Sequence, residues 1–220
     1  MVKDIKSVWD NVYTERGSNV PWATENWLNA SLPDIINFIV SNGIKIDSLL
    51  DYGAGTGHFA LALKSALNIP KVIAADISDK GLDKQRLVDA GIDFIITDQP
   101  KDVGGKYDVI LCWAVFHHID SKYYKDFLSQ FHSMLNDDGV LLLGAWSSED
   151  KHFAGKETAP GVYSGVTMYS MKSLESGKVF DEVGFKVAAS GKIINDFDLE
   201  YRIAMKVSDR LLQYYFLKKS

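Results

Sequence analysis

The feature that most constrains this chain is a glycine loop near the end of its first quarter, at residues 48–60, SLLDYGAGTGHFA. A short apolar run ends at Asp51, three glycines follow at a spacing of two, and a helical pattern of apolar residues begins directly after them. This order predicts a strand, a glycine loop and a helix. Glycine lets the chain reverse sharply, and its missing Cβ lets a ligand lie on the backbone amides at the helix N-terminus. We therefore expect a nucleotide-like ligand at this loop.

The spacing of the glycines indicates which nucleotide-like ligand the loop holds. A dinucleotide fingerprint needs a glycine three residues after Gly55, and His58 occupies that position. Asp51 would repel a pyrophosphate, so a ligand with a positive group fits better. The pattern Asp51-x-Gly53-x-Gly55-x-Gly57 resembles the S-adenosylmethionine loop of class I methyltransferases. The ligand of that family carries an ammonium and a sulfonium group and no phosphate. A plain tight turn between strand and helix is the alternative interpretation.

Length and composition limit the remaining possibilities. The chain has 220 residues, enough for one α/β domain and too few for two of ordinary size. The net charge is −5, unlike that of a dedicated nucleic-acid binder, so we expect no nucleic-acid partner. Without a long apolar run or a leader, we expect a cytoplasmic protein that does not enter a membrane. Cys112 is the single cysteine and lies in an apolar run, so we expect a buried, inert thiol.

Residues 1–45 precede the first predicted strand. Apolar residues at helical spacing predict two helices, over residues 2–13 and 25–40. We expect this segment to form a helical cover over the mouth of the nucleotide site. Tyr13 and Trp22 are candidate substrate contacts because aromatic faces favour a cation or a planar acceptor, and core packing is the alternative for both.

Strand-like and helix-like segments alternate after the glycine loop. The patterns predict strands at residues 71–76, 92–97, 107–113, 140–146, 185–194 and 211–217, and helices at 79–90, 122–135 and 171–183, while 199–208 fits either. The alternation predicts an α/β fold with a doubly wound, mainly parallel sheet, helices on both faces and the ligand at the carboxyl ends of the strands. The methyltransferase resemblance implies seven strands, the last of them antiparallel. We expect one domain over 1–220, with a cofactor-binding half at 46–146 and an acceptor-side half at 147–220.

Acidic residues follow the second and third predicted strands. Asp76 lies 25 residues after Asp51, a spacing that suits a ribose-binding carboxylate. A helix N-cap is the alternative, but Ser78 or Asp79 can take that role and leave Asp76 free. In the resembled family an acidic or amide side chain after the third strand binds the adenine amino group, and Asp98 matches, with a turn residue as the alternative. The candidate residues for binding S-adenosylmethionine are Asp51, Gly53, Ala54, Gly55, Gly57, Asp76, Ile77, Asp98, Gln99 and Trp113.

Two adjacent histidines follow the fourth predicted strand in the segment WAVFHHID, residues 113–120. An apolar-x-His-His-apolar sequence at this place resembles small-molecule methyltransferases, and the motifs of DNA methylases are absent. We expect no metal site, because neighbouring side chains usually point apart and no third ligand lies nearby. His117 is the candidate general base, since imidazole titrates near neutral pH, and a capping or packing role is the alternative.

The segment at residues 147–170 has no steady period. Its aromatic residues suit a loop or short helix that lines an acceptor pocket, and loop packing is the alternative. Trp146 and Tyr163 therefore join Tyr13, Trp22 and His117 as candidate substrate contacts. Aromatic residues here and in the N-terminal cover suggest an apolar or planar acceptor.

The methyltransferase resemblance runs over about residues 48–145 and implies a reaction. A methyl group would pass from S-adenosylmethionine to an oxygen, nitrogen or sulfur atom of a small-molecule acceptor by in-line displacement. Alignment and exclusion of water can supply most of the acceleration in such a reaction. Alternatives are a protein or RNA methyltransferase, a non-catalytic S-adenosylmethionine-binding regulatory module, and an NAD-dependent oxidoreductase, which His58 and Asp51 oppose. The sequence does not predict the oligomeric state.

Overall fold

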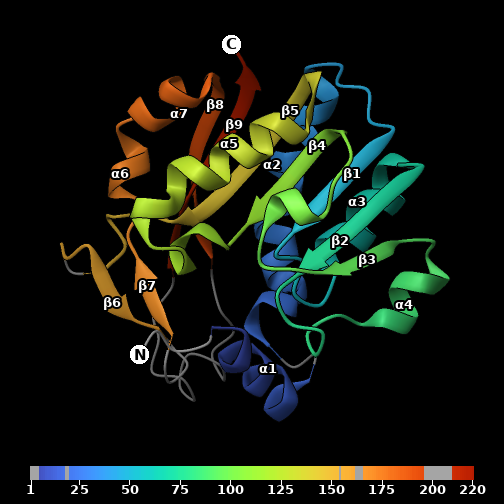
Figure 1. The fold of residues 1–220 in the computed structure, drawn as a ribbon, viewed down its shortest axis with the longest axis horizontal. Helices are drawn as coiled ribbons and strands as arrows, with labels where there is room; N and C mark the ends of the chain where they lie inside the picture. The colour runs from blue at the N-terminus through green and yellow to red at the C-terminus, as the bar shows by residue number, and fades with distance from the viewer. Residues whose placement is uncertain (1–4, 18–19, 154, 162–165, 196–209) are drawn as a thin grey trace.

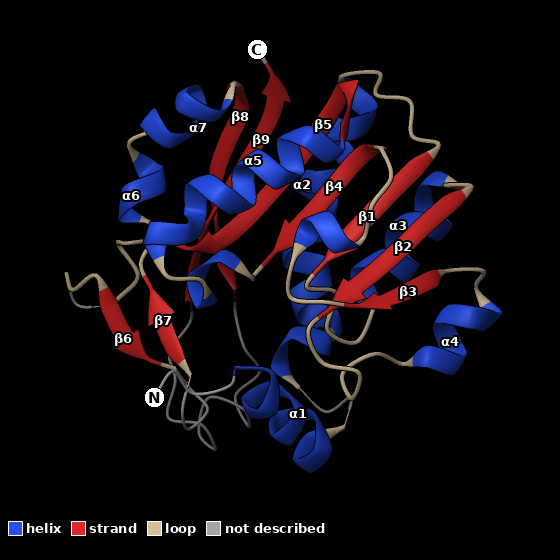
Figure 2. Cartoon of the chain, viewed as in Figure 1, coloured by secondary structure: helices blue, strands red, loops and turns tan. Residues whose placement is uncertain are grey.

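A seven-stranded sheet forms the centre of the computed structural model, which describes residues 5–17, 20–153, 155–161, 166–195 and 210–220. The strands lie in the order β3-β2-β1-β4-β5-β9-β8. Strand β9 is antiparallel to both of its neighbours, and the other strands are parallel (Figure 2). The bounds are β1 (Ser48–Tyr52), β2 (Lys71–Asp76), β3 (Asp93–Ile96), β4 (Tyr107–Trp113), β5 (Leu135–Trp146), β8 (Phe185–Asn195) and β9 (Arg210–Lys219). This topology confirms the predicted fold class.

Helices cover both faces of the sheet (Figure 1). The α-helices are α1 (Ile5–Arg16), α2 (Glu25–Ser41), α3 (His58–Leu67), α4 (Lys84–Asp89), α5 (Tyr124–Met134), α6 (Lys172–Glu175) and α7 (Lys178–Val183). Short 3-10 helices are η1 (Pro21–Ala23), η2 (Pro100–Asp102), η3 (Phe116–His118) and η4 (Ser121–Tyr123). None of the described helices is long and apolar enough to cross a membrane.

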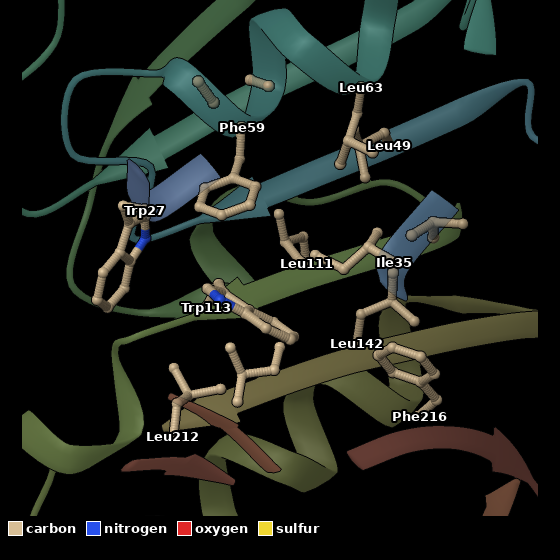
Figure 3. Packing of buried hydrophobic residues seen from close by; sticks show 14 of the residues in the cluster. Trp27, Ile35, Leu49, Phe59, Leu63, Leu111, Trp113, Leu142, Leu212 and Phe216 are labelled. Carbon is tan, nitrogen blue, oxygen red and sulfur yellow. The ribbon is translucent and has the colours of Figure 1, made fainter. Parts of the chain in front are cut away.

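The two-residue period of the strands divides the core between the two faces. Leu49 of β1 packs in one cluster with Ile35 of α2 and Leu63 of α3 (Figure 3). The next residue of β1, Leu50, packs in the opposite cluster with Leu128 of α5. Both faces of the central strands are therefore buried, as their continuous apolar runs require. The buried faces hold the strand ends, and the loops that follow them, in fixed positions.

Several predicted elements differ from the structure, and the strand predicted at 140–146 begins earlier, at Leu135. The helix predicted over 79–90 is shorter in the structure, where α4 begins at Lys84. It begins there because Asp83 caps it by accepting the backbone N–H of Arg86 at 3.2 Å. The helix predicted over 171–183 is divided into α6 and α7 at Gly177, which has a φ of 73°.

The segment at 147–170 contains an antiparallel pair, β6 (Thr158–Pro160) and β7 (Thr167–Tyr169), where a loop or short helix is predicted. Residues 199–208, for which the sequence fits strand or helix, lie outside the described residues.

Candidate active site

A cavity of about 600 Å³ lies at the carboxyl ends of the parallel strands. Its described lining comes from the loops that follow β1 to β4, the end of β5, helix α1 and strand β7. Figure 1 shows α1 beyond these strand ends, with β7 on the side of the acceptor half. The sheet and its cover thus bring together segments from both halves of the chain, as a site for two reactants requires.

The glycine loop forms one wall of the cavity. Gly53 and Gly55 line it with φ values of 76° and 59°, in the left-handed region that favours glycine. The backbone N–H groups of Gly53 and Ala54 donate to the carbonyl of Ala75 at 2.7 and 3.0 Å, which ties the loop to the end of β2. A Cβ on Gly55 would lie 3.1 Å from the hydroxyl oxygen of Tyr13. The cover therefore packs directly on the loop.

Gly57 has a different place from the one predicted for it. It is not among the residues that line the cavity, and it forms the N-cap of α3 with a φ of 81°. A Cβ at this position would lie 2.7 Å from Cδ2 of Leu87 in α4. Gly57 is thus a packing glycine that lets two helices approach closely, whereas Gly53 and Gly55 face the site.

Two buried carboxylates lie at the glycine loop. Asp51 accepts the backbone N–H of Ala60 at 3.1 Å, and burial raises its pKa to about 7, with the nearby charge of Asp76 contributing. Asp76 accepts N–H groups of Gly55 at 2.8 Å and Ser78 at 2.9 Å, and burial raises its pKa to about 6. Asp76 is not the N-cap of α4, a role that Asp83 takes, but each of its carboxylate oxygens accepts a backbone N–H group. Asp76 therefore fixes the shape of the glycine loop.

The other predicted cofactor residues surround this pair of carboxylates. Ala54, Ile77, Asp98, Gln99 and Trp113 all line the cavity. The backbone carbonyl of Asp98 accepts a 2.8 Å hydrogen bond from the hydroxyl of Tyr52. The indole of Trp113 donates to the buried hydroxyl of Ser31 at 3.2 Å, which fixes its orientation.

Aromatic residues of the N-terminal cover close the cavity from above the strand ends. Tyr13 and Trp22 both line it, and the indole N–H of Trp22 donates to the hydroxyl of Tyr13 at 3.1 Å. Trp9 of α1 meets Trp22 edge-on, with ring centroids 5.8 Å apart. Asp10 accepts a 2.6 Å hydrogen bond from the hydroxyl of Ser78 in the loop after β2. The cover is thus joined to the same loop that Asp76 holds.

Three further rings line the cavity, and we call Trp146, His117 and His118 the acceptor wall. His117 is stacked on Trp146, with centroids 4.6 Å apart and planes at 15°, and lies 4.1 Å from His118. Burial, and then the neighbouring His118, lowers the pKa of His117 well below its ordinary value. Within the described chain, the Nδ1 atoms of both histidines and Nε1 of Trp146 have no hydrogen-bond partner. Tyr163, also predicted here, lies outside the described residues.

A family model described as a methyltransferase domain matches residues 25–190. The chain belongs to this family. This family match confirms the methyltransferase resemblance that is inferred from the glycine loop and from the motifs that follow it. Within the described parts of this methyltransferase domain, no group of three His, Cys, Asp or Glu side chains is arranged to hold a metal ion.

One relative of this methyltransferase domain is the sphingolipid C9-methyltransferase of Komagataella phaffii, 31% identical over 122 residues. The alignment covers 46% of this chain and 25% of that protein, so the match spans about a quarter of the relative's length. Among solved structures, magnesium protoporphyrin IX methyltransferase from Synechocystis, with bound S-adenosylhomocysteine, has a TM-score of 0.68 at 18% identity, covering 96% of this chain and 97% of that one.

A second similar structure is the 1,6-didemethyltoxoflavin-N1-methyltransferase of Burkholderia thailandensis, with bound 1,6-didemethyltoxoflavin and S-adenosylhomocysteine. Its TM-score is 0.70 at 15% identity, and the alignment covers 100% of this chain and 91% of that one. These likenesses support the fold of the methyltransferase domain along the whole chain.

Several residues of this methyltransferase domain that shape the site are not among those predicted. Asp10 and His118 adjoin predicted residues, but the sequence does not show the direction of their side chains. Arg210 and Asp150 form a buried ion pair at 3.0 Å, next to the acceptor wall. They are 60 residues apart, and no local pattern indicates that they meet.

Proposed function

We propose that this domain transfers a methyl group from S-adenosylmethionine to an oxygen, nitrogen or sulfur atom of a small-molecule acceptor. The observation that carries the proposal is the pair of buried carboxylates, Asp51 and Asp76, at the glycine loop. Among the described residues that line the cavity, none is arginine, and the one lysine, Lys122, pairs with Asp120 at 3.1 Å. Such a site is complementary to a sulfonium and an ammonium group and unfavourable for a pyrophosphate.

The residues at the glycine loop suit the parts of this cofactor. Each oxygen of Asp76 accepts one backbone N–H and keeps a second lone pair, so the carboxylate can also accept hydrogen bonds from the ribose hydroxyls. Asp51 would pair with the ammonium group, which favours its ionised form. Asp98 and Gln99, in the loop after β3, would contact the adenine, with Ile77 beside it.

When bound, S-adenosylmethionine supplies an electrophilic methyl group on its sulfonium. The protein's part is to hold the acceptor in line with that group and to keep water away. We assign these two tasks to the rings of the acceptor wall and to the cover, because both line the cavity. His117 is neutral at neutral pH because its pKa is lowered, so it can orient an acceptor but is a weak proton acceptor. The acceptor must therefore carry a nucleophile that needs little help from a base.

A small-molecule acceptor is supported by the enclosure of the site. Trp9, Tyr13 and Trp22 lie over the cavity, where a protein or RNA methyltransferase would need an open approach for its large substrate. The proteins named above act, by their names, on a sphingolipid, magnesium protoporphyrin IX and 1,6-didemethyltoxoflavin. All three are small molecules.

Calorimetric titration with S-adenosylhomocysteine and with NAD tests the proposal. We expect the first to bind and NAD not to bind. Asp76→Asn should weaken S-adenosylhomocysteine binding by about tenfold or more, because charged hydrogen bonds contribute about 1.5–3 kcal/mol. The exposed Asp93→Asn is the matched control and should bind as the wild type does. Binding of NAD alone, or of neither compound, would overturn the proposal.

A further inference from the structure

A buried ion pair joins the turn after β5 to the start of β9. Arg210 Nη1 lies 3.0 Å from Asp150 Oδ1, and the two side chains are 1% and 2% exposed. The other carboxylate oxygen of Asp150 accepts the backbone N–H of Leu211 at 2.7 Å. Removing two charges from water is costly, and apolar side chains of similar volume are often at least as stabilising. Fold stability alone therefore does not explain this arginine, so the position of its guanidinium group is informative.

The guanidinium group of Arg210 lies on the ring of Trp146. Its Cζ atom is 4.1 Å from the ring centroid, within the range of a cation–π contact. Trp146 in turn is stacked on His117, nearly parallel to it. Asp150 thus fixes the guanidinium, the guanidinium fixes the plane of the indole, and the indole fixes the imidazole. The planar fork of arginine suits both of its contacts better than the flexible ammonium of lysine.

The acceptor wall carries no net charge. Burial, then the adjacent histidine and the positive charge of Arg210, hold the pKa of His117 well below its ordinary value. The charge of Arg210 is balanced by Asp150. In the lining of the same cavity, Lys122 pairs with Asp120 at 3.1 Å. Each of these charged side chains has an opposite charge beside it.

We propose that Arg210 is a positioning residue of the acceptor site, and that the uncharged aromatic wall it holds selects an acceptor with an uncharged planar ring system. The inference rests on the proposed function. A planar ring packs well against aromatic side chains that are already held in place, through offset or edge-to-face contacts, because little side-chain freedom is lost on binding. A carboxylate on that ring would be buried at a wall where, among the described residues, Arg210 and Lys122 each already have an anion beside them, which is unfavourable. An aliphatic chain gains no stacking.

The first test compares three compounds on the full chain saturated with S-adenosylhomocysteine. Naphthol is a planar uncharged ring, naphthoate has the same ring with a carboxylate, and decanol is aliphatic. We expect naphthol to bind at least about tenfold more tightly than either of the others, measured by calorimetry. Equal affinity for naphthoate or decanol would overturn this inference and leave the proposed function unaffected. Failure of S-adenosylhomocysteine to bind would overturn the proposed function, and the inference with it.

The second test asks whether Arg210 positions the wall. Arg210→Lys keeps the charge without the planar fork, Arg210→Met removes the charge, and Arg86→Met, on the exposed face of α4, is the matched control. We expect both Arg210 variants to lose at least about fivefold in naphthol affinity, with S-adenosylhomocysteine affinity changed less than about twofold. In Arg210→Met the pKa of His117, followed by NMR, should rise, whereas the control leaves it unchanged.

Unchanged naphthol binding in the variants would overturn the positioning role, as would an equal loss of S-adenosylhomocysteine affinity. If Arg210→Met does not fold, Arg210→Lys decides the question, because it retains a cation to pair with Asp150.

Discussion

The substitution Asp51→Asn should stabilise the ligand-free protein and weaken cofactor binding. Burial raises the pKa of Asp51 from 3.8 to about 7. The folded state therefore binds a proton more tightly than the unfolded chain, so stability falls as the pH rises from about 4 to about 7. Each unit by which the pKa is raised corresponds to about 1.4 kcal/mol of free energy. Ionised Asp51 therefore disfavours the folded state by up to about 4 kcal/mol at pH 8.

Asparagine has no charge and can still accept the backbone N–H of Ala60, but its amide N–H groups need partners in a buried site. We therefore expect about half of that free energy, about 2 kcal/mol at pH 8, to be recovered. For a domain of this size that gain corresponds to a rise in melting temperature of about 4–8 °C.

Melting curves at pH 8 and pH 5 measure the effect. At pH 5 the carboxyl group of folded wild-type Asp51 is mostly protonated, so the gain from Asp51→Asn should fall to less than half of its value at pH 8. Binding of S-adenosylmethionine at pH 8 should weaken by about tenfold or more, because the cation loses its charged partner. Asp93→Asn, at an exposed position, should change neither quantity. A variant that is less stable at pH 8, or equally stabilised at both pH values, would refute the reasoning.

Three further predictions concern the loop, the cover and the core. Gly53→Ala should lower the unfolding free energy by about 1–3 kcal/mol, because φ is 76° and the new Cβ would clash with the side chain of Val115. Denaturation measures this loss. The same variant should abolish S-adenosylhomocysteine binding, measured by calorimetry. Ser78→Ala removes the hydrogen bond to Asp10 and should speed hydrogen exchange of the α1 amides, corresponding to about 1 kcal/mol, and unchanged exchange would contradict this. Cys112 is fully buried with a raised pKa, so a thiol reagent should label it only after unfolding, and labelling of the folded protein would contradict its burial.

The central strands could be predicted from the sequence because they are buried on both faces. The strands predicted at residues 71–76 and 107–113 contain the continuous apolar runs 72–75 and 109–113, and β2 and β4 have the predicted bounds. The start of β5 could not be predicted in this way. Residues 136–139 have the composition of a turn, but β5 begins at Leu135, and these residues lie opposite Asp108 as an irregularity of the ladder. Asn136 donates to Asp108 at 2.6 Å, a tertiary contact that no local pattern shows.

The short elements of the acceptor half depend on contacts distant in sequence. Strands β6 and β7 have only three residues each, too few for a period to be seen, and they form because they pair with each other. A left-handed Gly177 divides α6 from α7, where the apolar pattern predicts one helix.

In the candidate site, the residue types and their strand ends were predictable, but the directions of their side chains were not. The three glycines of the loop look equivalent in sequence, yet Gly53 and Gly55 face the cavity and Gly57 faces Leu87. Arg210 comes to the acceptor wall only because β9 lies next to β5. The cytoplasmic location and the assignment of individual residues to cofactor and acceptor stay predictions.

The central claim is tested most directly by following the methyl group itself. The purified protein is incubated with S-adenosylmethionine that carries a deuterated methyl group, together with a low-molecular-weight extract, and the products are analysed by mass spectrometry. We expect S-adenosylhomocysteine to form together with a small molecule that has gained the deuterated methyl group, and Asp76→Asn to reduce both products. Label found only on protein or RNA, or no transfer by a protein that binds the cofactor, would contradict the account.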